Sequence, residues 1–180
     1  WLAILLLWTP LFADEPHPTL ALGSAAPDFS LPGIDGKTHK LSDYASAKVL
    51  VIVFTCNHCP TAQLYETRIK KLADDYRGKD VALVAIQPNN PAAIRLDELG
   101  YTDVSDSFED MKIRAAYRHF NFPYLYDGDT QAVARAYVSK QPVNPGVALA
   151  FVNRVLFLRP EDGPAHLTAG PTHRVGVRQL

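Results

Sequence analysis

A strand–helix–strand pattern restricts the fold of this chain more than any other feature of its sequence. Residues 49–55 form a continuous apolar and β-branched run, which is typical of a strand buried on both faces of a sheet. Apolar side chains then recur at helical spacing, up to a glycine at position 78, at Tyr65, Ile69, Leu72 and Tyr76. A second apolar run covers residues 81–87. The segment therefore predicts a βαβ unit and an α/β fold.

Weaker patterns predict the elements around this unit. Turn signals at Pro32-Gly33 and Asp35-Gly36 divide short apolar pieces, which indicates a β-hairpin within residues 26–41. The other predicted elements are helices at 91–99 and 107–119 within an insertion over 88–128, a helix at 129–137, and a closing hairpin of 147–152 and 155–158 turning at Asn153-Arg154.

The composition is that of one globular domain. The chain has 180 residues, 47% of them hydrophobic and 21% charged, enough to bury a core without covalent cross-links. Its net charge of −1 supplies no basic field, so nucleic acid is not a predicted partner. Two cysteines cannot make a disulfide-rich scaffold, and if they have a function they act as one pair.

The N-terminal residues predict export. Residues 2–12 are apolar apart from Thr9 and Pro10, and the small residue Ala13 precedes a polar stretch. This pattern is typical of a signal peptide, or of a truncated membrane anchor, over residues 1–13, followed by a linker over 14–21. The alternative is a buried N-terminal strand or helix. We expect the mature protein to act outside the cytoplasm.

The C-terminal residues are atypical of a compact α/β domain. Residues 141–180 contain no lysine and no tyrosine, and 171–180 show no regular apolar periodicity. We therefore place the domain at residues 22–160 and predict that 161–180 form a disordered tail. The alternative is a shift of the reading frame after Tyr137, which translation of the other two frames would test.

Both cysteines lie in the segment Cys56-Asn57-His58-Cys59-Pro60, between the first buried strand and its helix. Free backbone N–H groups and the helix dipole favour a thiolate at such a helix start. The two-residue spacer lets the sulfurs form a disulfide, and Pro60 is tolerated at the first helical position. We expect Cys56 to be the exposed nucleophile, Cys59 the more buried resolving thiol, and His58 a cation that stabilises the thiolate.

Three other interpretations of the segment 56–60 assign it no redox role. A structural zinc site needs two further ligands, and the remaining histidines show no paired spacing, so no metal site is predicted. A purely structural disulfide would not need a helix start or a histidine in the spacer. His58 could also be a solvated loop residue.

The segments 26–31, 35–37 and 41–43, with the apolar strand leading to Cys56–Pro60, resemble the thioredoxin-like redoxins. This family carries an alkyl hydroperoxide reductase/thiol-specific antioxidant domain and includes exported thiol-disulfide oxidoreductases of the TlpA and ResA type. The resemblance covers about residues 22–137. It implies a thioredoxin-like fold, with a central mixed sheet flanked by helices, an N-terminal β-hairpin and a central insertion. It also implies a bacterial periplasmic location.

The sequence departs from the family pattern at three places. Leu50 stands where thioredoxins have a buried acid, so a proton acceptor must come from elsewhere in the chain. Counted from Thr55, the peroxiredoxin pattern P-x-x-x-T-x-x-C has Val51 at its proline position and His58 at its cysteine position. The family's cis-proline has Pro142 as its counterpart, with Pro145 in reserve. We expect Pro142, Asn57 and Pro60 to line the substrate groove.

The sequence thus predicts an exported thiol-disulfide oxidoreductase. Its partners would be thiol or disulfide protein substrates and a redox protein that donates or accepts electrons. No organic cofactor is implied, because the dithiol carries the electrons. The alternatives are a Cu(I)-binding chaperone of thioredoxin fold, for which two thiolates and an imidazole are suitable soft ligands, and a peroxiredoxin-like peroxidase.

Overall fold

A computed structural model of the chain describes residues 20, 24–102, 104–138, 154–160 and 173–179. For the last two segments it gives the backbone only. The predicted signal peptide or anchor, most of the predicted linker, the strand at 147–152, Pro142 and Pro145 lie outside the described residues. Within the described residues, no helix has the length and apolar character needed to cross a membrane.

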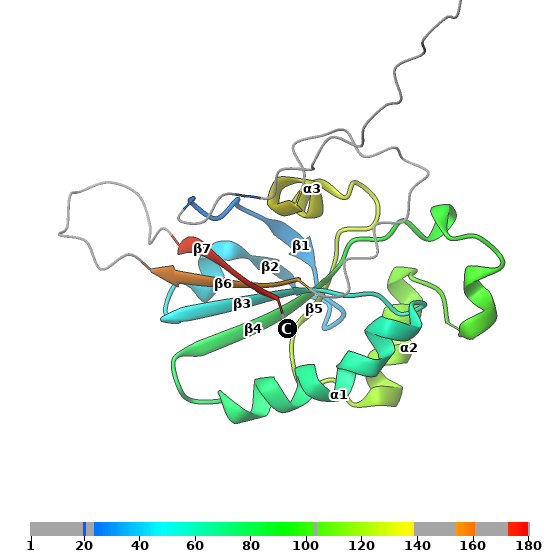
Figure 1. Cartoon of the computed structure of the whole chain (residues 1–180), viewed down its shortest axis with the longest axis horizontal. Helices are drawn as coiled ribbons and strands as arrows, with labels where there is room; N and C mark the ends of the chain where they lie inside the picture. Colours follow the sequence, from blue (N-terminus) through cyan, green and yellow to red (C-terminus); the bar gives the residue numbers. More distant parts are fainter. Residues whose placement is uncertain (1–19, 21–23, 103, 139–153, 161–172, 180) are drawn as a thin grey trace, which may run out of the picture.

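A five-stranded mixed sheet forms the centre of the molecule (Figure 1), in the order β5–β4–β3–β6–β7. Strands β3, β4 and β5 run parallel, whereas β6 is antiparallel to both β3 and β7. The register of β3 on β4 places Val49 opposite Val81 and Phe54 opposite Ile86. The strands span Val49–Phe54 (β3), Val81–Gln87 (β4), Tyr124–Tyr126 (β5), Arg154–Pro160 (β6) and His173–Gln179 (β7).

Helices and a hairpin cover this sheet on opposite sides (Figure 1). Helices α1 (Pro60–Asp75) and α2 (Phe108–Arg118) lie on one face. Helix α3 (Ala132–Val138) and the hairpin of β1 (Ser30–Pro32) with β2 (Thr38–Lys40) lie on the other. Three short 3₁₀ helices complete the described elements: η1 (Leu41–Tyr44), η2 (Pro91–Ala93) and η3 (Glu98–Tyr101).

Strand β3 supplies side chains to both layers because successive residues of a strand point to opposite faces. Leu50, Ile52 and Phe54 belong to the apolar core shared with α3 and the hairpin. Val51 and Val53 belong to the core shared with α1 and α2. All five are at most 4% exposed, so the continuous apolar run of the sequence corresponds to a strand buried on both faces.

A buried ion-pair cluster fixes α1 against α2. Glu66 of α1 is 3% exposed, and its two carboxylate oxygens accept hydrogen bonds from Nε of Arg114, at 2.8 Å, and of Arg118, at 2.7 Å. A buried carboxylate needs such partners, because its unpaired burial costs several kcal/mol. The pairing determines how α2, and the loop that precedes it, sits beside the start of α1.

Much of the predicted architecture is confirmed: the βαβ unit, the hairpin, the mixed sheet, and helices close to 107–119 and 129–137. The helix predicted at 91–99 is wrong. Residues 91–101 instead contain the two short 3₁₀ helices η2 and η3, because no helical apolar stripe is available to pack against the core.

The C-terminal prediction also needs correction. Arg154, predicted in a turn, begins β6, and part of the predicted disordered tail forms β7, which pairs with β6. The sequence signal for β7 is a short alternation, in which Val175 and Val177 stand between Arg174, Gly176 and Arg178. An alternation this short is easily overlooked without its partner strand.

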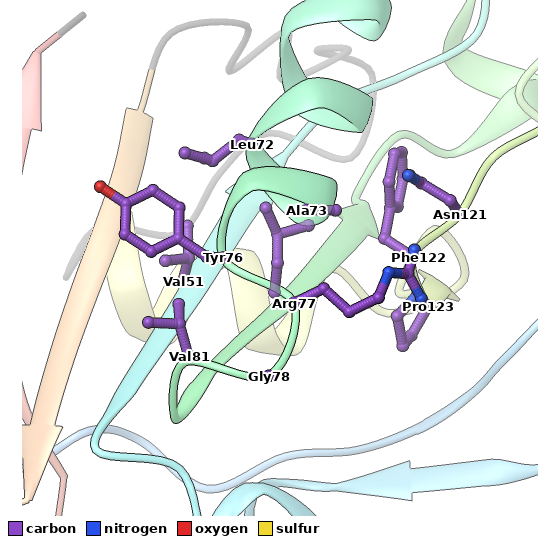
Figure 2. A pocket seen from close by; sticks show the side chains of 11 residues that line it. Val51, Leu72, Ala73, Tyr76, Arg77, Gly78, Val81, Asn121, Phe122 and Pro123 are labelled. Atoms are coloured by element: carbon purple, nitrogen blue, oxygen red, sulfur yellow. The ribbon is translucent and has the colours of Figure 1, made fainter.

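A cavity of about 180 Å³ lies where α1 ends (Figure 2). It is lined by the last turn of α1 and by the first residues of β3 and β4, including Leu72, Val51 and Val81, with Asn121 and Arg77 at one side. The cysteine segment follows the opposite end of β3 and precedes α1. This cavity is therefore separate from the cysteine pair.

Candidate functional site

The cysteine pair occupies the junction of β3 and α1, as predicted. Cys59 is the N-cap residue of α1 and Pro60 its first residue, and both thiols are free. Their exposure is the reverse of the expectation: Cys56 is 4% exposed, whereas Cys59 is only partly buried. The loop before α2 packs against this segment, because Asp106 accepts hydrogen bonds from the backbone N–H groups of Asn57 and His58, directly after Cys56.

The two thiols have opposite electrostatic environments. A hydrogen bond from the Cys56 thiol, together with the backbone N–H groups of Ala62 and Thr61, lowers the pKa of Cys59 to about 5, against the opposing effect of burial. The same hydrogen bond to Cys59, together with burial and the nearby Asp106, raises the pKa of Cys56. At neutral pH the reduced protein therefore holds a thiolate at Cys59 and a proton on Cys56.

His58 forms a buried ion pair with Asp106. Its Nδ1 lies 2.6 Å from Oδ2 of Asp106, and the two side chains are 7% and 0% exposed. The hydrogen bond to Asp106 is the largest influence on His58 and raises its pKa, although burial opposes it. The imidazolium in turn helps to lower the pKa of Cys59. His58 is thus a partner of the thiolate rather than a solvated loop residue.

The side chain of Asp106 also binds the backbone of the segment that carries the cysteines. Its Oδ1 accepts the N–H of Asn57 at 2.7 Å and that of His58 at 3.1 Å. Asp106 Oδ2 accepts a hydrogen bond from Nδ2 of Asn89 at 2.7 Å, and the side-chain amide of Gln87 donates a hydrogen bond to the backbone carbonyl of Asp106. Asn89 is itself fully buried, and its Oδ1 has no hydrogen-bond partner among the described residues. The carboxylate of Asp106 is therefore the centre of a buried polar network.

Asp106 is the functional residue that sequence reasoning missed. It lies 48 residues from His58, directly before Ser107, the N-cap of α2 whose hydroxyl accepts the N–H of Asp110 at 3.1 Å. Its only signal in the sequence is this position before a helix start. Because Leu50 occupies the position at which thioredoxins have a buried acid, the sequence indicated that a proton acceptor must come from elsewhere in the chain. Asp106 is an acidic residue beside the cysteine pair.

The residues expected to line the substrate groove have different environments. Asn57 is 1% exposed and links three segments of the chain. Its Oδ1 accepts a hydrogen bond from the hydroxyl of Tyr124 at 3.1 Å, and its Nδ2 donates a hydrogen bond to the backbone carbonyl of Ser105 at 2.7 Å. Its place in the substrate groove stays a prediction, and the burial of its side chain leaves little of it accessible to a substrate. Pro60 is exposed beside Cys59 and can contact a substrate.

Three buried side chains are placed so that they could hold a metal ion. One donor atom each of Cys56, His58 and Asp106 lies within 4.8 Å of the other two. Thiolate, imidazole and carboxylate are all ligands of zinc in proteins. The site thus combines a low-pKa thiolate, a partner thiol, and a potential set of metal ligands.

Comparison with known proteins places this site in a family. The sequence pattern of the AhpC/TSA family matches residues 22–162. Two curated relatives from strains of Mycobacterium tuberculosis, named "Putative peroxiredoxin MT2597" and "Putative peroxiredoxin Rv2521", are each 25% identical over 119 residues, which cover 65% of this chain and 76% of theirs.

Solved structures confirm the fold. An uncharacterized conserved protein from Geobacillus kaustophilus is 31% identical, with a TM-score of 0.59 over 86% of this chain and 76% of its own. A hypothetical protein from Sinorhizobium meliloti is 25% identical, with a TM-score of 0.62 over 88% of this chain and 70% of its own. The chain has a thioredoxin-like fold, and it belongs to the AhpC/TSA family of redox proteins.

Proposed function

We propose that this protein is a thiol-disulfide oxidoreductase that works through the Cys56–Cys59 pair. The observation that carries the proposal is the position of Cys59, which is partly exposed at the N-cap of α1 three residues after Cys56, where the pKa of its thiol is lowered to about 5. A thiolate is the nucleophile of disulfide exchange, and an adjacent thiol resolves the product. The AhpC/TSA family membership supports redox chemistry of thiols at this site.

The greater exposure of Cys59 supports our proposal that Cys59 takes the first step, whereas the sequence predicted Cys56. The Cys59 thiolate attacks one sulfur of a substrate disulfide, forms a mixed disulfide, and releases the other substrate sulfur as a thiolate. Cys56 then transfers its proton to the released substrate thiolate or to water and attacks Cys59 Sγ, which releases the second substrate thiolate. The substrate gains two electrons, and the protein is left with a Cys56–Cys59 disulfide. Oxidation of a dithiol substrate is the reverse sequence.

Asp106 and His58 support this chemistry without transferring electrons. The buried carboxylate raises the pKa of His58 and so favours its charged form, which in turn favours the thiolate of Cys59. A site that stabilises its thiolate stabilises the reduced form, which makes the pair more oxidising. The N-terminal residues 2–12 are the support for our proposal that this activity takes place outside the cytoplasm, in the bacterial periplasm.

Peroxide reduction is the second candidate function. The family and the names of the Mycobacterium tuberculosis relatives favour it, and a low-pKa thiolate beside a second thiol can also attack a hydroperoxide. The peroxiredoxin pattern favours it less, because its cysteine position corresponds to His58. Thiol loss on addition of hydroperoxide, followed by turnover with a dithiol donor, would identify this activity.

Trapping the mixed disulfide tests the proposal and the order of attack. The C56S variant keeps the Cys59 thiolate, and we expect it to accumulate a stable mixed disulfide with a peptide disulfide at pH 6. The C59S variant should react more slowly at that pH, because burial and the charge of Asp106, which remain after Cys59 is replaced, still raise the pKa of Cys56. Fast trapping by C59S alone would restore Cys56 as the nucleophile. No trapping by either variant would overturn the function.

The reduction potential supplies an independent check. We expect wild-type protein, equilibrated with glutathione buffers, to show a reversible two-electron couple. A value above about −220 mV marks an oxidant or isomerase, whereas a value near −270 mV marks a thioredoxin-like reductant. Failure to form any reversible Cys56–Cys59 couple would contradict the proposal.

A further inference from the structure

We propose that the reduced protein binds one Zn²⁺ ion through Cys56, Cys59, His58 and Asp106. This site goes beyond the proposed function, because it needs neither a substrate nor a redox partner. The prediction from sequence that no metal site exists rested on the lack of paired histidines and further cysteines. The fold supplies the missing ligand as a carboxylate from the loop before α2.

The donor atoms are already close together. Those of Cys56, His58 and Asp106 lie within 4.8 Å of one another, whereas Cys59, whose thiol interacts with that of Cys56, lies outside this group. In a tetrahedral zinc site, with Zn–S near 2.3 Å and Zn–N or Zn–O near 2.0–2.2 Å, neighbouring donors stand roughly 3.3–3.8 Å apart. Small movements of the three grouped side chains would therefore bring them into contact with one ion, and Cys59 would have to turn toward that ion to become the fourth ligand.

A metal ion can replace the polar contacts within this group. His58 Nδ1 lies 2.6 Å from Asp106 Oδ2, and the Cys56 thiol interacts with that of Cys59. Zinc replaces protons on such ligands, because it binds neutral imidazole, thiolate and carboxylate. The dication would also balance the negative charges of two thiolates and Asp106 in a buried place, where unbalanced charge is costly.

The carboxylate decides between zinc and copper. Cu(I) selects soft thiolate and thioether ligands and accepts imidazole, so a copper site would use the two sulfurs and His58 alone. Zinc accepts oxygen ligands as well as nitrogen and sulfur. Asp106 is 0% exposed, and Asn89 Nδ2 donates to the same Oδ2 that faces His58. A ligand oriented in this way by a neighbouring side chain is typical of zinc sites.

Zinc binding and disulfide formation exclude one another at this site, because both use the two sulfurs. In the zinc form each sulfur is bound to the metal as a thiolate. Reaction with a substrate disulfide then forms the Cys56–Cys59 bond, releases two substrate thiolates, and sets Zn²⁺ free. The metal would thus protect the reduced pair and leave when the pair is oxidised.

Metal titration of the purified full chain tests the inference. Protein reduced with a phosphine and stripped with a chelator is titrated with Co²⁺, whose thiolate charge-transfer absorption reports sulfur ligation, and then with Zn²⁺ against a chromophoric chelator. We expect one equivalent of each metal, with Zn²⁺ displacing Co²⁺. The oxidised wild-type protein, whose fold is checked by circular dichroism, should bind none. Equal binding by the oxidised and reduced protein, or no binding by either, would overturn the inference.

Two variants locate the site. D106N should weaken Zn²⁺ binding by at least about tenfold. D35N is the matched control, because Asp35 contacts His39 on the exposed hairpin in a similar way, and it should leave the affinity unchanged. If D106N does not fold, the contrast between oxidised and reduced wild-type protein still decides. Unchanged Zn²⁺ affinity in folded D106N, or tight Cu(I) binding without Zn²⁺ binding, would contradict the proposal.

Zinc binding and the proposed function can fail separately. A protein that binds Zn²⁺ but traps no mixed disulfide would keep the metal site and lose the oxidoreductase function. A protein that exchanges disulfides but binds no Zn²⁺ would do the opposite.

Discussion

Two histidine–aspartate pairs in this protein make nearly the same contact in opposite environments. In the hairpin, His39 Nε2 lies 3.1 Å from Asp35 Oδ1, and the side chains are 16% and 46% exposed. At the cysteine site, His58 Nδ1 lies 2.6 Å from Asp106 Oδ2, and the side chains are 7% and 0% exposed. The first pair is four residues apart in the sequence, whereas the second joins residues 48 apart.

The contrast shows that burial, rather than contact geometry, determines what such a pair does. Water screens an exposed pair, so the pair adds little to the free energy of unfolding and can be lost at small cost. A buried carboxylate has no water to replace a lost partner. Asp106 therefore constrains both the fold of the cysteine loop and the charge of His58, whereas Asp35 constrains only its own turn.

The largest expected difference between the pairs is in stability. D106A removes an acceptor used by two backbone N–H groups, His58 and Asn89, and should lower the free energy of unfolding by ~3–5 kcal/mol. D35A should lower it by less than about 1 kcal/mol. Denaturant unfolding of both variants in the oxidised state measures this. Equal losses would show that burial of Asp106 is not what matters.

The second prediction concerns the pH dependence that the buried site creates. The pKa of Cys59 is lowered to about 5 in the folded protein, so the folded state binds fewer protons than the unfolded state between pH 5 and the ordinary thiol pKa of about 8.5. The free energy of unfolding of the metal-free reduced protein should therefore rise with pH across this window and lose that contribution as pH falls through 5.

The oxidised protein is the control for this effect, because it has no thiol to titrate. Its stability curve should lack the rise, while effects of His58 remain in both forms. Thiolate absorbance of the reduced protein should show a midpoint near pH 5. A midpoint near the ordinary thiol value, with parallel stability curves, would show that the site does not stabilise a thiolate.

The sequence predicts the hairpin that carries the Asp35–His39 pair, but it does not predict that Asp106 pairs with His58. The hairpin that carries His39 and Asp35 follows from turn signals, and the position of Cys56 and Cys59 follows from a buried strand that leads into a helix. Each rests on neighbours in the chain. The sequence-based resemblance also indicated the family and the mixed sheet, because those depend on the same continuous segments.

The contacts of the cysteine segment depend on a loop that sequence periodicity cannot place. Residues 102–107 have no regular apolar pattern, so nothing in them indicates that Asp106 accepts hydrogen bonds from the backbone of Asn57 and His58. The same loop buries Asn57, which its sequence position alone suggested as a substrate contact. β7 was missed for a related reason, since a strand with only two apolar residues is defined by its partner.

A third prediction ranks the contributions to the Cys59 thiolate. The hydrogen bond from Cys56 is the largest influence on the pKa of Cys59, and the charge of His58 is a smaller one. C56A should therefore raise the pKa of Cys59 from about 5 by more than H58Q does. Thiolate absorbance against pH measures both. A larger rise in H58Q would show that the imidazolium, rather than the partner thiol, controls the nucleophile.

The smallest expected effect belongs to D35N, and it sharpens the comparison because the substitution keeps the shape of the side chain. An amide oxygen can still accept a hydrogen bond from the N–H of Lys37, which lies 3.2 Å from Asp35 Oδ1, so the turn should persist.

Slight burial opposes ionisation of Asp35, but the hydrogen bond from His39 prevails and lowers the pKa of Asp35. The pair therefore adds stability above the unfolded carboxyl pKa of about 3.9, and that stability is lost as pH falls through the folded value. D35N should lose only this small contribution at neutral pH, while the thiolate midpoint stays near pH 5. A shifted midpoint in D35N would mean that charges on the hairpin reach the cysteine site, and that the two pairs are not independent.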